Sequence, residues 1–354
     1  LGLVDFKTKS PMKGCSLEEF LKLEALEPED YDFKYLMHDY YDNYKDKHKN
    51  DADYEGILKE TKKMGNKRGV ELWYAYRTSD ECYKSQRRHR FDCDSSNGTN
   101  ALMDEIYDLL WRKIEEWGAP LGAPQKFGGD TMNSFATTFN ALMQKRGFKE
   151  SIQAYRASTN MDEKLLETLE RYATYTGCLG NFTLVPKGYN GHRGISSTLQ
   201  DYWDLSLNDL RRNGSGGDWL GNSDISFGRY INTFFLWDYV DEAYHVRPLF
   251  SGHEPLLDPK AWVLPRHREQ RQVDEFAEFM SNVNIRIKRR GKFMVAMLKI
   301  ASESPEDWRK IVTKLATDVR LGTMEQVVNG LKNMDLQPST VNRLGKIDLG
   351  EGAI

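Results

Sequence analysis

The chain has 354 residues and a formal net charge of −3, with 39% hydrophobic and 29% charged residues. This balance excludes a globally basic protein that binds nucleic acid over its whole surface, but it leaves room for a local basic patch. No apolar run reaches the roughly 18 to 20 residues of a membrane-spanning helix, and the first residues show no long apolar leader. We therefore expect a cytoplasmic protein that makes no membrane contact.

The cysteines and histidines argue against a metal site. Four cysteines (Cys15, Cys82, Cys93 and Cys178) are widely spaced, and only Cys82 and Cys93 are close enough in the chain to suggest a bridge. No CxxC, HxH or HExxH spacing occurs. The sequence therefore predicts reduced thiols and no metal, and it leaves the cofactor unknown.

The first hundred residues predict one helix and one strand. Ser16-Leu-Glu-Glu19 is a capping box, which predicts a short helix ending near Leu26. The acidic segment 27–60 is typical of a polar surface with part-helical character. Alternating residues at 70–76 predict a strand, and the composition of 92–100 predicts a loop.

Helical spacing of apolar residues then predicts a helix over 102–117, ended by Gly118-Ala-Pro120. After a Gly/Pro-rich loop at 118–129, Asp130 is expected to cap a helix through about Lys145. Thr159 and Asp162 mark the start of another helix, which runs to about Thr174.

The second half predicts further helices around one short strand. Asn181–Val185 is a strand candidate closed by Pro186. Residues 227–240 are apolar nearly all round, which predicts a buried central helix, whereas the composition of 213–223 and 246–272 indicates loop and coil.

Helices are also predicted over 273–300, after Ser304 with Pro at the first position, and from Thr323, before a tail from Leu344. The fold class is therefore mainly α with a few short β-strands. Residues 1–300 form the main helical domain and residues 301–354 a C-terminal helical extension.

The stretch from Thr176 to Asn208 contains the strongest candidate site. Glycine-rich turns there surround amides at Asn181 and Asn190, and Arg193 offers a planar fork suited to phosphate or carboxylate. Such a loop can hold an anionic ligand, with Asp201 or Asp204 as base or as a partner of the arginine. The alternative is that these residues organise their own turn and that Arg193 pairs with one of the two aspartates.

Other candidates have the same two interpretations. His192 lies inside the stretch and can serve as a general base, or it is a solvated loop histidine. Asp130, Asn133 and Ser134 can present polar groups to an anion at a helix N-terminus. Alternatively, Asp130 is the N-cap of that helix, and Asn133 and Ser134 lie in its first turn. The basic runs 84–90 and 286–292 can contact a polyanion, but the default interpretation of the second is a solvated helix face.

Four segments together resemble a bacterial family of domains of unknown function: GGDTMNSF, LGNFTLVPKGYNGHRG, DYWDLSLNDLRR and FGRYINTFFLWDYV. The resemblance covers roughly residues 30–295. It implies that a shared set of polar positions forms a site, without naming its chemistry. These positions are Asp130, Asn133, Ser134, Asn181, Asn190, Arg193, Asp201 and Asp204.

Two functional hypotheses follow. In the first, the protein binds or processes an anionic ligand, a nucleotide or a nucleic acid, and Arg193 holds the phosphate. Because families of this kind are associated with such systems, the resemblance also implies a role in phage defence or as a toxin. In the second, it is a non-catalytic α-helical interaction protein whose helices after Ser304 contact a protein partner. If Arg193 and Asn190 point into a concave pocket without partners, the first hypothesis is favoured. If Arg193 pairs with Asp201 or Asp204 and the surface is flat, the second is favoured.

Overall fold

The computed structural model describes Leu17 and residues 105–117, 127–145, 148–157, 162–176, 179–195, 199, 202–212, 217–250 and 273–350. Within them the chain is mainly α-helical with one two-stranded sheet, which confirms the predicted fold class. No helix in these ranges combines the length and apolar character needed to cross a bilayer. Several predictions lie outside the described residues: the rest of the helix after Ser16, segments 27–60, 70–76, 84–90 and 92–100, and the four cysteines.

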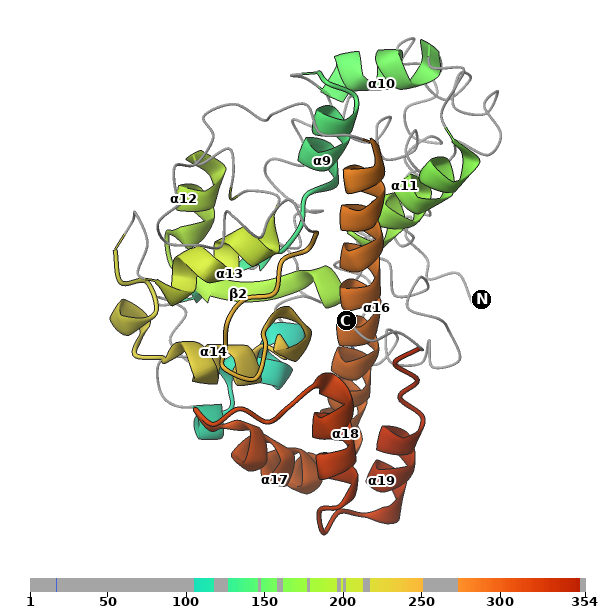
Figure 1. Ribbon diagram of the computed structural model, residues 1–354. Helices are drawn as coiled ribbons and strands as arrows, with labels where there is room; N and C mark the ends of the chain where they lie inside the picture. The colour runs from blue at the N-terminus through green and yellow to red at the C-terminus, as the bar shows by residue number, and fades with distance from the viewer. Residues whose placement is uncertain are drawn as a thin grey trace, which may run out of the picture.

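The long helix α16 (Val273–Glu303) runs through the middle of the molecule (Figure 1). The elements before it are, in chain order, η3 (Asp108–Arg112), η4 (Glu115–Trp117), β1 (Phe127–Thr131), α9 (Phe135–Leu142), α10 (Phe148–Ala157), α11 (Glu163–Tyr175), η5 (Leu179–Asn181), β2 (Phe182–Pro186), α12 (Tyr189–Ile195), α13 (Trp203–Arg211), η6 (Gly221–Ser223), α14 (Phe227–Thr233) and η7 (Trp237–Tyr239). The elements after it are α17 (Pro305–Leu315), α18 (Met324–Lys332) and α19 (Pro338–Gly345).

α16 confirms the helix predicted over 273–300, but its basic run is not a solvated face. Arg286, Arg289 and Arg290 are all buried. Each guanidinium reaches acceptors on other segments, and Arg289 forms an ion pair with the carboxylate of Asp238 at 2.7 Å. The acid-before-base pattern along the helix was misleading because these acceptors come from distant parts of the chain.

Arg290 fastens three segments to α16 through backbone carbonyls. Its Nη1 donates to the carbonyls of Gly180 at 2.8 Å and Phe182 at 2.7 Å, and its Nε donates to that of Phe234 at 2.9 Å. Burial lowers the pKa of Arg290 to about 10, so the side chain still carries its charge at neutral pH. The end of η5, the start of β2 and the end of α14 are thereby fixed to one helix.

The same place shows the closest approach of two backbones. A Cβ added at Gly180 would lie 2.7 Å from the amide nitrogen of Gly291 and would also collide with the carbonyl oxygen of Ile287. Only glycine fits such a contact, because any larger residue would push η5 away from α16.

The sheet corrects one prediction and confirms another. β1 and β2 pair antiparallel, with Asp130 opposite Thr183. Asp130 therefore lies in a strand and does not cap a helix, and α9 begins only after Ser134. β2 is the short strand predicted before Pro186.

Three further expectations differ from the structure. Residues 227–240 do not form one helix: α14 ends at Thr233, Phe235 adopts a positive φ of 58°, and η7 follows, although the segment from Tyr230 on is buried as predicted. Around the predicted strand, the stretch 176–208 contains the helices α12 and α13, where glycine-rich turns were expected. Helices α10 and α19 were not predicted from the sequence.

Local signals correctly predicted three further helix starts, whereas the single helix expected over 102–117 is interrupted after Arg112, where η3 gives way to the separate η4. α11 follows Asp162, α17 starts with Pro305, and α18 has a full capping box in which Thr323 and Gln326 exchange hydrogen bonds. α16 continues unbroken through residue 300, and the division into residues 1–300 and 301–354 stays a prediction.

We predict that Gly180→Ala lowers the free energy of unfolding by about 1–3 kcal/mol or more, because overpacking forces two backbones apart. Gly191→Ala is the matched control, since an added Cβ meets nothing within 4 Å there. Urea unfolding followed by circular dichroism measures both. Equal stability of the two variants would contradict the close approach.

Candidate functional site

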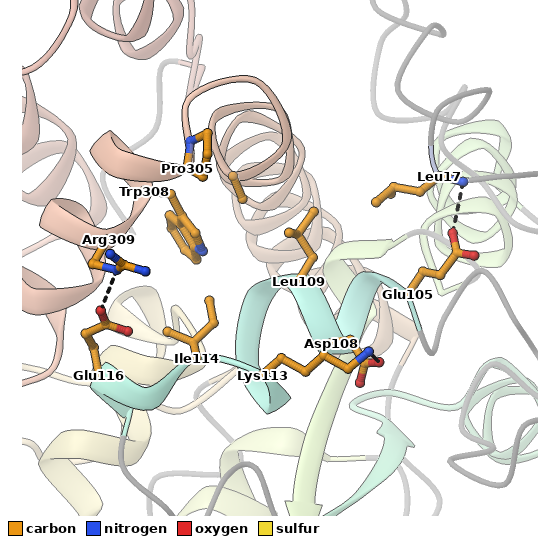
Figure 2. A pocket seen from close by; sticks show the side chains of 11 residues that line it. Leu17, Glu105, Asp108, Leu109, Lys113, Ile114, Glu116, Pro305, Trp308 and Arg309 are labelled. Carbon is orange, nitrogen blue, oxygen red and sulfur yellow. Dashed lines mark hydrogen bonds and ion pairs between the residues drawn. The ribbon is translucent and has the colours of Figure 1, made fainter.

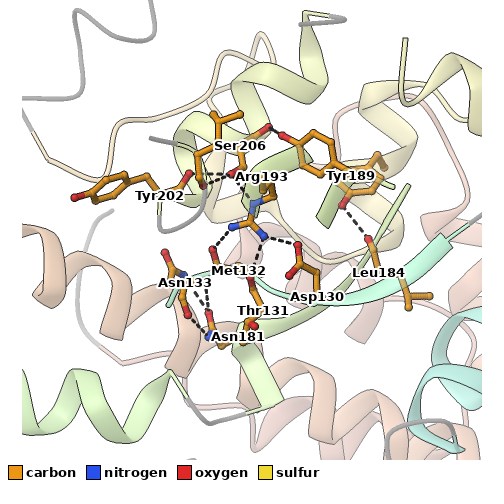
Figure 3. Close-up of polar contacts among 12 residues, drawn as sticks. Asp130, Thr131, Met132, Asn133, Asn181, Leu184, Tyr189, Arg193, Tyr202 and Ser206 are labelled. Carbon is orange, nitrogen blue, oxygen red and sulfur yellow. Dashed lines mark hydrogen bonds and ion pairs between the residues drawn. The ribbon is translucent and has the colours of Figure 1, made fainter. Parts of the chain in front are cut away.

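Arg193 projects from α12 toward β1 and forms a buried ion pair with Asp130 (Figure 3). Its Nη1 also donates to the carbonyl of Thr131 at 3.0 Å, and its Nη2 donates to that of Met132 at 2.9 Å. The side chain is 2% exposed. The guanidinium therefore joins α12 to the end of β1.

The remaining contacts of Arg193 come from α13. Its Nε donates to the hydroxyl of Ser206 at 3.0 Å, and its guanidinium lies 5.1 Å from the ring centre of Trp203. A buried charge needs this degree of compensation, because desolvation would otherwise cost several kcal/mol. The geometry favours the interpretation in which Arg193 organises its own region. Its ion-pair partner is Asp130 on β1, however, where Asp201 or Asp204 was expected, because the strand pairing brings Asp130 next to α12.

Asn181 and Asn133 form a second buried unit beside this pair (Figure 3). The side-chain oxygen of Asn181 accepts from the amide nitrogen of Asn133 at 3.0 Å and from its side-chain nitrogen at 3.1 Å. The side-chain nitrogen of Asn181 donates to the carbonyls of Asn133 at 2.9 Å and Thr176 at 2.8 Å. These amides close the turn after β1 onto η5 and are not turned toward solvent.

The other predicted site residues lie apart from each other. Asp204 is buried and accepts from the backbone nitrogens of Leu205 at 2.9 Å and Leu249 at 2.8 Å. Ser134 is the half-buried N-cap residue of α9, Asn190 is exposed on α12, and Asp201 lies outside the described residues. The structure thus brings Asp130, Asn133, Asn181 and Arg193 together.

His192 belongs to a different cluster, on the outer side of α12. Its Nε2 lies 3.4 Å from a carboxylate oxygen of Asp209, which is fully buried on α13. The imidazole packs against Tyr189 and Trp219, with ring centres 5.7 and 5.5 Å away. The side chain of His192 keeps 19% exposure, so it is neither a fully solvated loop histidine nor a core residue.

Tyr189 connects the two clusters. Its hydroxyl donates to the carbonyl of Ser206 at 2.8 Å, beside the hydroxyl that Arg193 contacts. Burial raises the pKa of the Tyr189 hydroxyl well above its usual value, and the nearby carboxylate of Asp209 raises it further. The phenol therefore stays a neutral donor under all ordinary conditions.

A groove of about 450 Å³ lies elsewhere, between the η3–η4 segment and the start of α17 (Figure 2). We call it the η3–α17 groove. Its apolar wall consists of Leu109 and Ile114 on one side and of Ala301, Pro305 and Trp308 on the other.

The wall at η3 has an unusual backbone. The amide nitrogen of Lys113 bonds to the carbonyl of Asp108 at 3.1 Å, which makes η3 a π-helix. Leu109, within η3, and Ile114, just after it, both line the groove (Figure 2).

The rim of the groove is charged. Asp108 pairs with Lys113 at 2.6 Å, and Glu116 pairs with Arg309 across the groove at 3.0 Å. Glu105, at the other end, accepts a hydrogen bond from the main-chain nitrogen of Leu17 at 3.2 Å (Figure 2). Three acidic and two basic side chains line the groove, which leaves an excess of one negative charge.

Asp209, Trp219 and the groove were missed at the sequence level. Asp209 lies in the same helix as Asp204, but nothing in its spacing marks it as the partner of His192. Leu109 and Ile114 belong to an apolar pattern that is typical of any helix face packed against a core, so the sequence does not mark them as part of a groove. In the described part of the chain, no three histidine, cysteine, aspartate or glutamate side chains converge as metal ligands would.

Comparison with protein-family models, with curated proteins and with solved structures finds no match. The resemblance to a bacterial family of domains of unknown function therefore stays a prediction.

We predict that Arg193→Ala lowers the free energy of unfolding by about 3–5 kcal/mol, because it leaves the carboxylate of Asp130 buried without its partner. Arg171→Ala is the control: it breaks the exposed pair with Glu167 and should cost at most about 0.5 kcal/mol. Urea unfolding of both variants gives the comparison. An Arg193→Ala protein as stable as the wild type would contradict the structural role.

Proposed function

We propose that the protein is an α-helical interaction protein that binds a partner in the η3–α17 groove. The observation that carries this proposal is an apolar groove of about 450 Å³ with charged residues at both ends, formed in part by α17. Ligand-binding sites typically have volumes of about 300–1,000 Å³, apolar walls and a few polar groups.

Two further features favour the groove, rather than the buried region around Arg193, as the binding site. π-helical turns are rare and frequently occur at functional sites, and η3 forms one wall. Arg193, the residue expected to hold a phosphate, is instead engaged by Asp130 and by backbone carbonyls. A partner that contacts the helices after Ser304 is the second of the two hypotheses drawn from the sequence.

The test uses Nile red, a neutral dye that fluoresces in apolar sites. We expect Ile114→Arg to weaken dye binding to the full chain at least about tenfold, because a charged side chain enters the apolar wall. Val319→Arg is the matched control, since Val319 is 69% exposed and lies outside the groove. Equal loss in both variants, or no loss in either, would contradict the proposal.

The His192–Asp209 pair supports a second candidate, acid–base processing of an anionic ligand such as a nucleotide or nucleic acid. A buried carboxylate beside a part-exposed imidazole can fix the ring and stabilise its protonated form during proton transfer. The exposed Asn190 lies on the same helix. A role in phage defence or as a toxin would build on this activity.

We predict for this candidate that His192→Gln reduces turnover of a responsive nucleotide or single-stranded nucleic acid at least about 100-fold, the scale of general acid–base catalysis. The assay compares wild type, His192→Gln and the exposed control His245→Gln on the same substrate panel. Absence of wild-type turnover on every substrate, or full activity of His192→Gln, would eliminate this candidate.

A further inference from the structure

The occupant of the η3–α17 groove can be narrowed from the contacts around it, and this inference rests on the proposed function. We propose that the groove binds a short peptide segment with a large aliphatic or aromatic side chain and with a lysine or arginine next to it. Such a segment would belong to a partner protein.

The peptide character of the occupant follows from the contact of Leu17. Its main-chain nitrogen donates to Glu105 at 3.2 Å, and its half-buried side chain points toward the Leu109 side of the groove (Figure 2). One residue of a polypeptide is therefore already accommodated here, with its amide on a carboxylate and its apolar side chain at the wall. A partner peptide would extend this pattern along the groove.

The apolar anchor follows from the walls. Leu109, Ile114 and Pro305 present aliphatic surface, and Trp308 lines the same groove with 4% of its own surface exposed. The groove has room for one or two large side chains. A peptide with only small or polar side chains would leave this surface in contact with water. An aliphatic or aromatic anchor removes it from water, and burial of apolar area is the main favourable contribution at such sites.

The positive charge follows from the rim. Lys113 is engaged by Asp108, whose hydrogen bond and charge raise the pKa of the lysine, and Arg309 is engaged by Glu116. Glu105 is exposed, and its one described hydrogen bond comes from the neutral amide of Leu17. Its charge acts on Lys113 only weakly compared with that of Asp108, and no base in the described ranges forms an ion pair with it. A cationic side chain on the peptide would complement Glu105, whereas an acidic one would meet repulsion.

The length follows from the spacing of the charged ends. Eleven positions separate Glu105 from Glu116, so a helical rise of about 1.5 Å per residue puts them at most roughly 16 Å apart along this segment. An extended peptide covers this distance in about four to five residues.

Three fluorescein-labelled pentapeptides test the inference by fluorescence anisotropy on the full chain. The first is Lys-Leu-Trp-Leu-Lys, the second is Glu-Leu-Trp-Leu-Glu, and the third is Lys-Ser-Ser-Ser-Lys. We expect the first to bind at least about tenfold more tightly than either of the others at low salt. The preference over the acidic peptide should shrink at 0.5 M NaCl, because exposed charges are screened.

Two exposed substitutions locate the charge preference. Glu105→Gln should reduce the ratio between the first and second peptides severalfold, whereas Glu303→Gln, on α16 outside the groove, should leave it unchanged. Both positions are at the surface, so neither variant is expected to unfold the protein.

The outcomes separate this inference from the proposed function. Equal binding of the basic and acidic peptides would overturn the charge preference, and tight binding of the serine peptide would overturn the apolar anchor. If none of the peptides binds while Ile114→Arg still abolishes Nile red binding, the groove is a binding site but not for a peptide of this kind. If Ile114→Arg leaves the dye unaffected, the proposed function itself fails.

Discussion

The contact between α16 and the segment at η5 and β2 determines where the rest of the structure can lie. Gly180 allows the two backbones to touch, and Arg290 donates hydrogen bonds to the carbonyls on either side of Asn181. With β2 fixed in this way, the antiparallel register places Asp130 of β1 within reach of Arg193. The two buried arginines thus have complementary roles. Arg290 positions the sheet against α16, and Arg193 attaches α12 and α13 to the sheet.

This arrangement changes which polar residues are available for function. Arg193 with Asp130 and Asn133 with Asn181 form two neighbouring buried pairs, and their side chains also bond to other segments of the chain. Buried networks of this kind rigidify and specify a fold when their groups are satisfied. Surfaces open to a ligand lie further out, at His192 on α12 and at the groove between η3 and α17.

The sequence predicted the elements whose signals are local. Pro305 and the pair Thr323 and Gln326 mark helix starts within a few residues of themselves, and both helices are present. Asp130 was assigned to a helix cap because its strand partner, Thr183, is far away in the chain. Arg290 was assigned to a solvated face for the same reason, since its acceptors are backbone carbonyls that no local pattern shows.

The sequence predicted some of the residues that meet at the candidate site, but it did not predict that they form a buried structural network. Four of the named polar side chains do meet in space, but burial and pairing, which decide between a ligand site and a structural network, depend on the whole fold. Likewise, an apolar pattern shows that Leu109 and Ile114 share a face and cannot show that α17 stops short of covering it.

The connecting arginines also have a consequence for how the chain acquires its structure during synthesis. Asp130 and Arg193 are 63 positions apart, and Gly180 and Arg290 are 110 positions apart. Contacts between residues so far apart in the sequence form slowly. The long intervening loop must close first, at a cost in chain entropy, before the contact can offset that cost. β2 and α13 leave the ribosome well before α16 does. Until α16 has been synthesised, the apolar surfaces that they later bury against the rest of the fold stay exposed. The interval before residue 290 is translated is therefore when the nascent chain exposes the apolar surface that most favours aggregation.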